Sequence, residues 1–320
     1  MGDRMTERVK APFIHTENND AYSAAAHLVS LVPAVAVGVV FYGLRAAVLI
    51  AFCSLLFALS DDVCSRIRHM SRGSILNPLF NGAVIALLLP PDTPLYVAAT
   101  GVLFASVIVR QLSGGRGSSF LNAAAAGRLF IRILFPLNEA ALAIPGENRL
   151  SLTSLLTGPR TPVPADLSQY YFAELFMGRF PSFIGTSCTV MLLAGLIYLL
   201  AKKVLKPYLP ACYLGMLTLL LLIKDIYMDT AQTGMFLLTS GILFTASYLI
   251  FDDDTVKSFG PVAVTQAFLC AGLTFLASFK LTGIDLLVIP VLITGILTDV
   301  LDFAFKVIRA TAEEDSSVKS

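Results

Sequence analysis

Residues 21–60 read AYSAAAHLVSLVPAVAVGVVFYGLRAAVLIAFCSLLFALS, an apolar run in which Arg45 is the one charged residue. A helix that crosses the hydrocarbon core of a bilayer needs about 20 such residues, so this run can supply two crossings. Backbone polar groups have no water to bind inside lipid, and a spanning segment of this kind must therefore be helical. We predict two membrane-spanning helices here, at 22–42 and 44–61.

Apolar runs of this kind continue along the 320 residues. The chain is 56% hydrophobic and only 14% charged, whereas a soluble domain carries about 25% charged residues. The sequence therefore predicts an all-α integral membrane protein in the lipid bilayer, with about ten transmembrane helices and no independent soluble domain. The eight further segments are predicted at 75–90, 95–111, 119–136, 182–201, 209–224, 233–251, 261–279 and 283–305.

Lysine and arginine residues are unevenly distributed between the connections. If the N-terminus is cytoplasmic, most of them lie on the inner side, as the positive-inside tendency requires. The outer side then holds only Arg45, Arg149, Arg160, Arg179, Lys224 and Lys280. We predict a multi-pass protein with both termini cytoplasmic and with the long segment 137–181 outside.

The long segment divides the predicted helices into two equal groups. We predict a cytoplasmic N-terminal segment (1–21), a first five-helix half (22–136), an extracytoplasmic loop (137–181), a second five-helix half (182–305) and a cytoplasmic tail (306–320). An odd number of helices in each half means that two repeats would be inverted in the membrane, which favours a binding site near the midplane beside broken helices. The residues alone do not reveal the repeat.

Several function classes are disfavoured by the residue pattern. No basic run is interleaved with aromatic residues, so no nucleic-acid partner is expected. The five cysteines form no CxxC pair, and the three histidines show no metal-ligand spacing. We expect no metal site and no catalytic residue of the Ser-His-Asp or Cys-His kind.

Residues 113–122, SGGRGSSFLN, precede the predicted fifth helix. Clustered glycines before a helix start can turn backbone N–H groups toward an anion, and they also build an ordinary interhelical turn with a cap. Within that helix, Arg128 and Arg132 lie four residues apart and share a face. Charged groups in a membrane helix usually face a partner or a cavity. Either an ion pair with acids such as Asp299 and Asp302 or an anion site would satisfy them.

Two polar stretches lie outside the predicted helices. Asp252, Asp253, Asp254 and Thr255 follow the eighth helix, where they could cap the next helix or line a cofactor or ion site. Residues 151–162, SLTSLLTGPRTP, have the composition of a turn-rich loop, whose hydroxyl groups usually bond to local backbone.

Taken together, several stretches resemble the D subunit of the bacterial Rnf electron-transport complex and the related B subunit of sodium-translocating NADH:quinone oxidoreductase. The similar stretches are the opening APFIHT (11–16), the Pro90-Pro91 ending of the third segment, RQLSGGRG (110–117) followed by Asn122, and 237–255 with Asp252 and Thr255 at its Asp and Thr positions. The resemblance implies a divergent member with a urea-transporter-like fold in the bacterial cytoplasmic (inner) membrane.

In that family an FMN is joined by a phosphoester to a threonine of an extracytoplasmic loop by a flavin transferase. Matching Ser154-x-x-Thr157 to the family pattern D-x-x-[ST]-x-A-T-P-L implies Thr157 as the acceptor. Ser151 stands at the pattern's Asp, and Leu156 at its Ala. Thr161, which precedes a proline, is the rival acceptor, and loss of the covalent flavin is the remaining alternative.

The function implied is that of a membrane component of an Rnf-type complex, part of a translocase rather than a stand-alone enzyme. It would carry electrons through FMN, with a second non-covalent flavin left open, and couple them to Na⁺ or H⁺ movement together with the other subunits. Asn122, Asp252 and Thr255 are expected to be structural or ion-path residues rather than contacts to the same FMN. The alternatives are a solute channel or transporter of the same architecture and a cofactor-less scaffold subunit.

Overall fold

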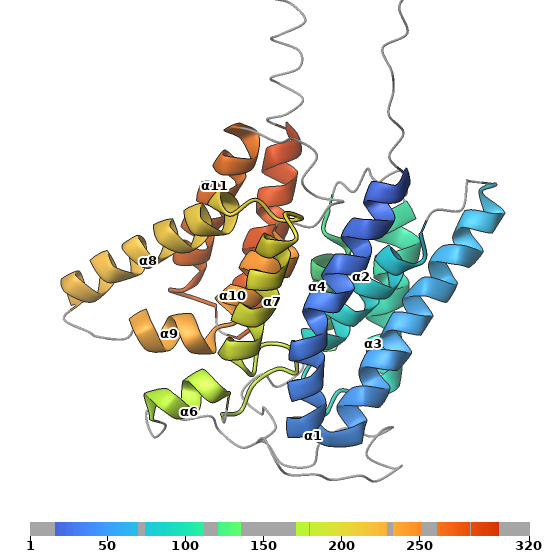
Figure 1. Cartoon of the computed structure of the whole chain (residues 1–320), viewed down its shortest axis with the longest axis horizontal. Coiled ribbons are helices and arrows are strands. Elements are labelled where there is room, and N and C mark those ends of the chain that lie inside the picture. The colour runs from blue at the N-terminus through green and yellow to red at the C-terminus, as the bar shows by residue number, and fades with distance from the viewer. Residues whose placement is uncertain are drawn as a thin grey trace, which may run out of the picture.

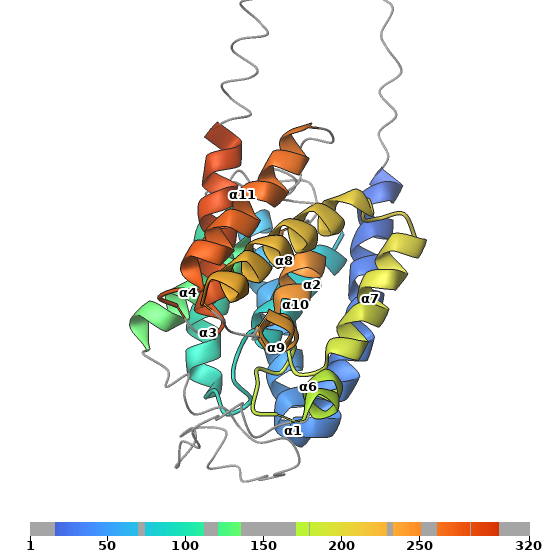
Figure 2. The same ribbon diagram turned by 90° about the vertical axis from the view of Figure 1, so that its left-hand side faces the viewer.

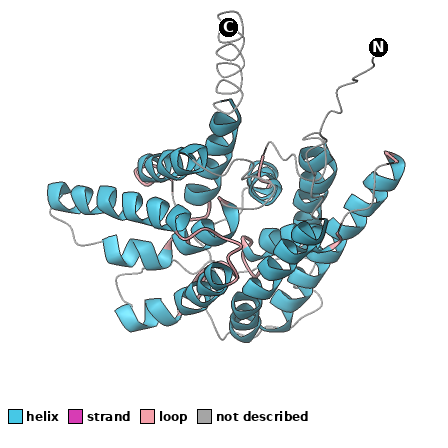
Figure 3. Cartoon of the chain, turned by 45° about the horizontal axis from the view of Figure 1, so that its top comes forward, coloured by secondary structure: helices cyan, strands magenta, loops and turns pink. Residues whose placement is uncertain are grey.

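The computed structural model describes residues 17–69, 74–111, 121–135, 171–178, 180–228, 233–250, 261–281 and 283–300. Throughout these ranges the chain forms helices and connecting segments, with no strand (Figure 3). The predicted all-helical class is therefore confirmed for the described part of the chain.

The first element, α1 (Glu17–Ile67), consists of two arms joined at a corner. Gly43 has φ 72° and ψ −164°, a backbone conformation that is essentially restricted to glycine. Figures 1 and 2 show the chain reversing direction there, so that the two blue arms lie side by side. The corner falls between the predicted segments 22–42 and 44–61, and both segments are helical as predicted.

The rest of the first half contains α2 (Leu76–Leu87), α3 (Leu95–Leu103), the π-helix η1 (Phe104–Arg110) and α4 (Ala123–Leu134). α3 and η1 together fill the predicted segment 95–111. The predicted segment 75–90 is shortened at its end, because α2 stops before Pro90 and Pro91. Proline lacks the N–H that would continue the helix, and it disfavours helical backbone in the residue before it.

The second half contains α6 (Phe172–Met177), α7 (Thr189–Ala201), α8 (Tyr208–Met228), α9 (Thr233–Thr239), α10 (Ile242–Phe244), the π-helix η3 (Thr245–Leu249), α11 (Pro261–Ala277) and a last helix at 285–300. Two predictions are corrected here. Residues 182–188, predicted as helix, are non-helical, and the predicted helix 233–251 is broken at Gly241, whose φ is 73°. The short helix α6 lies within the predicted loop 137–181.

Within the described residues, two helices are long and apolar enough to cross a membrane, Ala21–Ile67 and Tyr208–Met228. Four shorter apolar helices accompany them, at Leu76–Leu87, Leu95–Arg110, Thr189–Ala201 and Val262–Ala277. The helix surfaces expose large apolar side chains, such as Leu59 and Ile226. Such surfaces suit lipid better than water. The number of ten helices and the inverted repeat stay predictions.

The ends of several elements lie together at the two ends of the molecule. In Figure 1 the start of α1 and the far end of the red helix 285–300 lie at the upper end, whereas α6 and the corner of α1 lie at the lower end. Loop segments run between the helices through the middle of the molecule (Figure 3). These central segments position the candidate site.

Candidate functional site at the helix breaks

α2 ends inside the protein, and its last carbonyl groups are bound by other parts of the chain. Gly185 N–H donates to the Leu87 carbonyl oxygen (2.8 Å), and Ile184 N–H donates to that of Leu89 (3.4 Å). Arg128 Nε donates to the Leu88 carbonyl oxygen between them, at 3.1 Å. Helix C-terminal carbonyls carry partial negative charge, so N–H donors and a guanidinium stabilise them. The end of α2 is thus capped within the core.

The segment 180–188 that supplies these N–H donors is buried throughout although it is not helical. A Cβ on Gly185 would lie 2.5 Å from Leu87 Cβ, so the close backbone approach depends on glycine. The Tyr42 hydroxyl donates to the Ser182 carbonyl oxygen at 3.1 Å. Irregular backbone at membrane depth is tolerated only where protein or a cavity surrounds it. Segment 180–188 fits this description.

A second helix break, between α9 and α10, meets the same segment. A Cβ on Gly241 would lie 2.6 Å from Thr186 Cγ2, and the Thr189 hydroxyl donates to the Leu238 carbonyl oxygen at 3.2 Å. The ends of α2 and α9 and the start of α7 therefore converge on residues 180–188. Broken helices that meet near the midplane form the substrate and ion sites of many transporters.

Asn122 joins the start of α4 to the end of η3. Its side-chain oxygen accepts from the Ala125 N–H (2.8 Å), which caps α4, and its side-chain nitrogen donates to the Leu249 carbonyl oxygen (3.0 Å). Leu249 is the last residue of η3, so this amide bridges two elements although the bonded residues are 127 positions apart in the sequence. Asn122 thus caps α4 and holds the end of η3 at the same time, and its role as a structural or ion-path residue stays a prediction.

Arg128 and Arg132 have different surroundings. Arg128 is fully buried, and its guanidinium lies over the Phe183 ring, 5.9 Å from the ring centroid. The side chain of Arg132 is one-third exposed and forms an ion pair with Asp285 at 2.8 Å.

The sequence suggested acids such as Asp299 and Asp302 as partners of this arginine pair, but the structure pairs Arg132 with Asp285 instead. Asp285 begins the last helix, and Asp299 lies 14 residues further along it, which corresponds to about 21 Å at 1.5 Å per residue. Arg132 therefore cannot contact both acids. Asp302, the other suggested acid, lies outside the described residues. The sequence could predict that the partner of Arg132 is a carboxylate of the last helix, but it could not predict at which end of that helix the partner lies.

A buried polar cluster at the end of η1 was missed as a site by sequence reasoning. Asp61 of α1 and Arg110 of η1, each with a side chain 2% exposed, form an ion pair at 3.3 Å. Gln111 donates to Asp61, and Arg110 donates to Asn77 of α2. The sequence feature that could have indicated this cluster is the carboxylate of Asp61, which ends a long apolar run. The cluster ties α1, α2 and η1 together immediately before the glycine-rich stretch.

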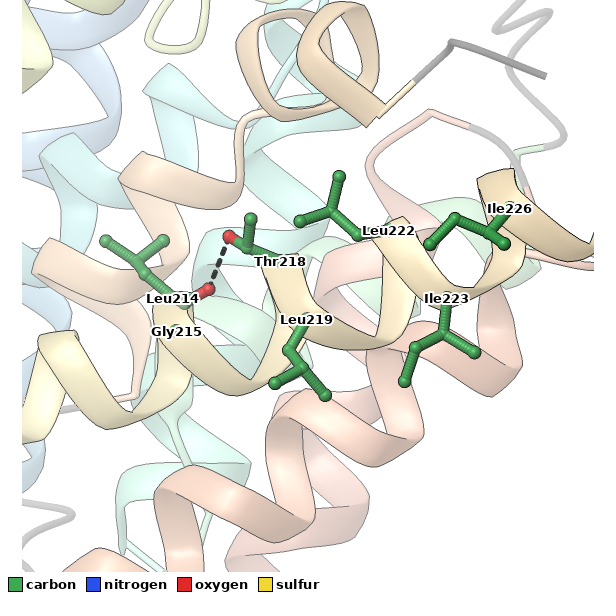
Figure 4. A pocket seen from close by; sticks show the side chains of 7 residues that line it. All are labelled: Leu214, Gly215, Thr218, Leu219, Leu222, Ile223 and Ile226. Atoms are coloured by element: carbon green, nitrogen blue, oxygen red, sulfur yellow. Dashed lines mark hydrogen bonds between the residues drawn. The ribbon is translucent and has the colours of Figure 1, made fainter.

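The other candidates lie outside the described residues: Ser154, Thr157, Thr161, Asp252 and Thr255. In the described part of the chain no group of three or more His, Cys, Asp or Glu residues could hold a metal ion. An open groove of about 450 Å³ follows α8 and is lined by apolar residues such as Leu219, Leu222 and Ile226 (Figure 4). It offers no charged group to a cofactor phosphate.

Comparison with known proteins gives consistent results. The D subunit of the Na⁺-translocating ferredoxin:NAD⁺ oxidoreductase complex of Acetobacterium woodii is 28% identical over 64% of this chain and 65% of its own length. The D subunit of the ion-translocating oxidoreductase complex of Haemophilus ducreyi is 24% identical over 80% of this chain and 84% of its own. The B subunit of the Na⁺-translocating NADH-quinone reductase of Chromohalobacter salexigens is 29% identical over 42% of this chain.

These matches differ in extent, since the chain spans only 34% of the length of the Chromohalobacter protein and slightly less than two thirds of the Acetobacterium protein. The match to the family itself is longer. The model of the NQR2, RnfD, RnfE family aligns with residues 8–309, which include the helix breaks, the buried arginines and the segment 137–181. The resemblance seen in the sequence motifs is thereby confirmed, and the chain belongs to the NQR2, RnfD, RnfE family.

Proposed function

We propose that this chain is the membrane subunit of an ion-translocating, flavin-based electron-transport complex of the Rnf type. The observation that carries the proposal is the family match over residues 8–309, together with relatives that are named as subunits of ion-translocating oxidoreductase complexes. In this proposal the chain carries electrons through FMN and couples them to Na⁺ or H⁺ movement. It acts with the other subunits of the complex and is modified by a flavin transferase.

The arrangement of the helix breaks supports a transport role. Residues 180–188 bring backbone N–H and carbonyl groups into the core beside the ends of α2 and α9. Such groups serve as ion and substrate ligands where helices are interrupted at membrane depth. We place the chain in the bacterial cytoplasmic membrane, with about ten helices in two inverted halves and both termini inside.

The flavin is proposed to bind through Thr157, with Ser154 beside it in the same loop and Thr161 as the rival acceptor. The FMN would supply the electron-carrying isoalloxazine, and the threonine would supply only the phosphoester oxygen. Asn122 lies within the described residues, and its amide is used to cap α4 and to bind the Leu249 carbonyl oxygen rather than being free for this flavin. The proposal therefore keeps Asn122 at the helix junction and the attachment in the loop.

In-gel flavin fluorescence of the denatured protein, taken from its native membrane, tests this proposal. Thr157→Ala should abolish the fluorescence, whereas Thr153→Ala, a matched threonine change in the same loop, should preserve it. Loss only in Thr161→Ala would move the attachment site and keep the function. A wild-type protein without covalent fluorescence would contradict the FMN assignment, and would leave a cofactor-less scaffold or a solute transporter.

A further inference from the structure

The connection between α7 and α8 concentrates positive charge in a few residues. Residues 202–207 read KKVLKP, and both Lys202 and Lys203 are exposed. In the described part of the chain no ion pair joins either of these two lysines to a carboxylate. We name residues 202–207 the lysine turn. The charge of its two exposed ammonium groups is therefore open to an anion from outside the chain.

The backbone of the lysine turn forms a complete Schellman motif, in which a left-handed residue follows the end of a helix. The Lys203 N–H donates to the Leu200 carbonyl oxygen (3.0 Å), and the Val204 N–H donates to that of Leu199 (3.2 Å). These carbonyl groups at the end of α7 are thus bound by backbone N–H groups. The lysine side chains are not needed to cap them.

Lys203 occupies the left-handed position of this motif, where glycine is usual. Its φ is 58°, and in the described part of the chain only one other non-glycine residue, His69, has a positive φ. A residue with a Cβ is less stable than glycine in this conformation. The preference for lysine on the inner side of a membrane explains a basic connection, but not a lysine at this one position. The side chain of Lys203 is held at a cost to the fold, which is typical of residues that contact a ligand.

The surface of α7 next to the lysine turn is apolar. Ala194, Ile197 and Ala201 are exposed and, spaced three and four residues apart, share one face of the helix. The Lys202 ammonium lies over an aromatic ring of the same helix, with Nζ 5.8 Å from the centroid of Tyr198. Tyrosine and lysine at the end of an apolar helix are typical of a membrane–water interface. An anion at the lysine turn would therefore have an apolar surface beside it, which suits the phosphate of a lipid.

α7 ends on the side of the molecule at which α1 begins (Figures 1 and 2). The charge pattern predicts that this side is cytoplasmic. Basic clusters beside a membrane helix on that side bind the head groups of anionic phospholipids.

We propose that the lysine turn binds the phosphate of an anionic phospholipid in the cytoplasmic leaflet. Lys202 and Lys203 hold the head group, and an acyl chain lies against Ala194, Ile197 and Ala201. The proposal rests on the proposed topology, and it does not depend on the redox role of the chain.

The chain contains no tryptophan, so a single introduced tryptophan reports on the lipid at one place. Ile197→Trp puts it on the apolar face beside the lysine turn, and Leu59→Trp puts it on the second arm of α1. The two positions are matched, at 64% and 63% exposed. Leu59 also lies about two turns before a cation, Arg66, but that cation is paired with Asp62 at 2.7 Å.

Each full-length protein is reconstituted in phosphatidylcholine vesicles. Its tryptophan fluorescence is then quenched with increasing fractions of brominated phosphatidylglycerol or of brominated phosphatidylcholine. The ratio of the two quenching curves gives the preference of the site for the anionic lipid.

At position 197, phosphatidylglycerol should be preferred at least about tenfold, because each lysine near an anionic lipid contributes about fivefold. At position 59 the two lipids should bind almost equally. Lys203→Gly, added to Ile197→Trp, should lower the preference about fivefold and yet maintain or raise the thermal midpoint, because glycine suits the left-handed position. Adding Lys202→Gln as well should abolish the preference. Lys280→Gln, at an exposed lysine of another connection, should leave it unchanged.

Four results would overturn the lipid site. They are equal quenching by both lipids at position 197, a preference of the same size at position 59, a preference that survives both lysine changes, and a preference that inorganic phosphate removes when sodium chloride of equal ionic strength does not. The last result would assign the lysine turn to a soluble anion. Because the quenching requires neither flavin nor a partner protein, these results leave the redox role untouched, and the absence of covalent flavin would leave the lipid preference unaffected.

Discussion

Gly185 illustrates how individual residues hold the helix breaks together. Its N–H binds the end of α2, and its missing side chain lets the two backbones approach. The sequence placed glycine in an apolar run but could not reveal which carbonyl it meets, because Leu87 lies far earlier in the chain. The same applies to Arg132. A charged side chain is costly inside a membrane helix, so the sequence predicted that Arg132 has a partner. Only tertiary packing shows that this partner is Asp285.

We expect Gly185→Ala to destabilise the protein, since the added Cβ would meet Leu87 Cβ at 2.5 Å. Overpacking of this kind costs about 1–3 kcal/mol. The thermal midpoint is measured in detergent as loss of the monodisperse peak in size-exclusion chromatography. Gly215→Ala is the control, because a Cβ at Gly215 meets nothing within 4 Å. Equal midpoints for Gly185→Ala and the wild type would refute the close contact.

The Arg132–Asp285 ion pair is expected to show coupling in a double-mutant cycle. Arg132→Met and Asp285→Asn should each lower the midpoint, because each leaves a charge at a partly or largely buried position without its partner. The double variant should recover part of the loss, corresponding to a coupling of about 0.5–3 kcal/mol. Strictly additive losses would mean that the two side chains do not interact.

At the scale of elements, the sequence predicted most helices but not where they stop inside the protein. Segments such as 209–224 and 261–279 correspond to α8 and α11 because long apolar runs in lipid can only be helical. Residues 182–188 are unwound although they continue into an apolar run, since their backbone groups find partners on α2 and need no helix of their own. Such an exception depends on neighbours that local composition does not describe. For the candidate site, the sequence predicted broken helices near the midplane but not residues 180–188, and the predicted flavin attachment at Thr157 lies outside the described residues.

The corner of α1 yields a prediction at this scale. Gly43→Ala should lower the midpoint, because φ 72° with ψ −164° is strained for any residue with a Cβ. The cost is about 1–3 kcal/mol. Gly272→Ala in α11 serves as the control, as a Cβ there meets nothing within 4 Å. If the two substitutions had the same effect, α1 would not turn at Gly43.

At the scale of the whole molecule, the charge pattern predicted a topology to which the fold adds an independent constraint. The start of α1 and the far end of the last helix lie at the same end of the molecule (Figure 1). The sequence alone could not show that these two ends lie together, because an error in any one predicted segment would change the number of membrane crossings. The loop that holds Thr157 was located by charge and family resemblance alone, and its site stays a prediction.

Reporter fusions test the orientation. Green fluorescent protein fused at either terminus should fluoresce, because the reporter matures in the cytoplasm and both ends are predicted there. Alkaline phosphatase inserted in the 137–181 segment should be active, because it requires the outer side. A fluorescent reporter in that segment, together with dark termini, would reverse the proposed topology.

The central claim, a redox component of an ion-translocating complex, is tested most directly by purifying the tagged chain from its native membrane in a mild detergent. The account predicts that it elutes within a larger assembly that contains other oxidoreductase subunits and shows flavin absorbance. A chain that elutes alone, carries no flavin and conducts a solute in liposomes would contradict it.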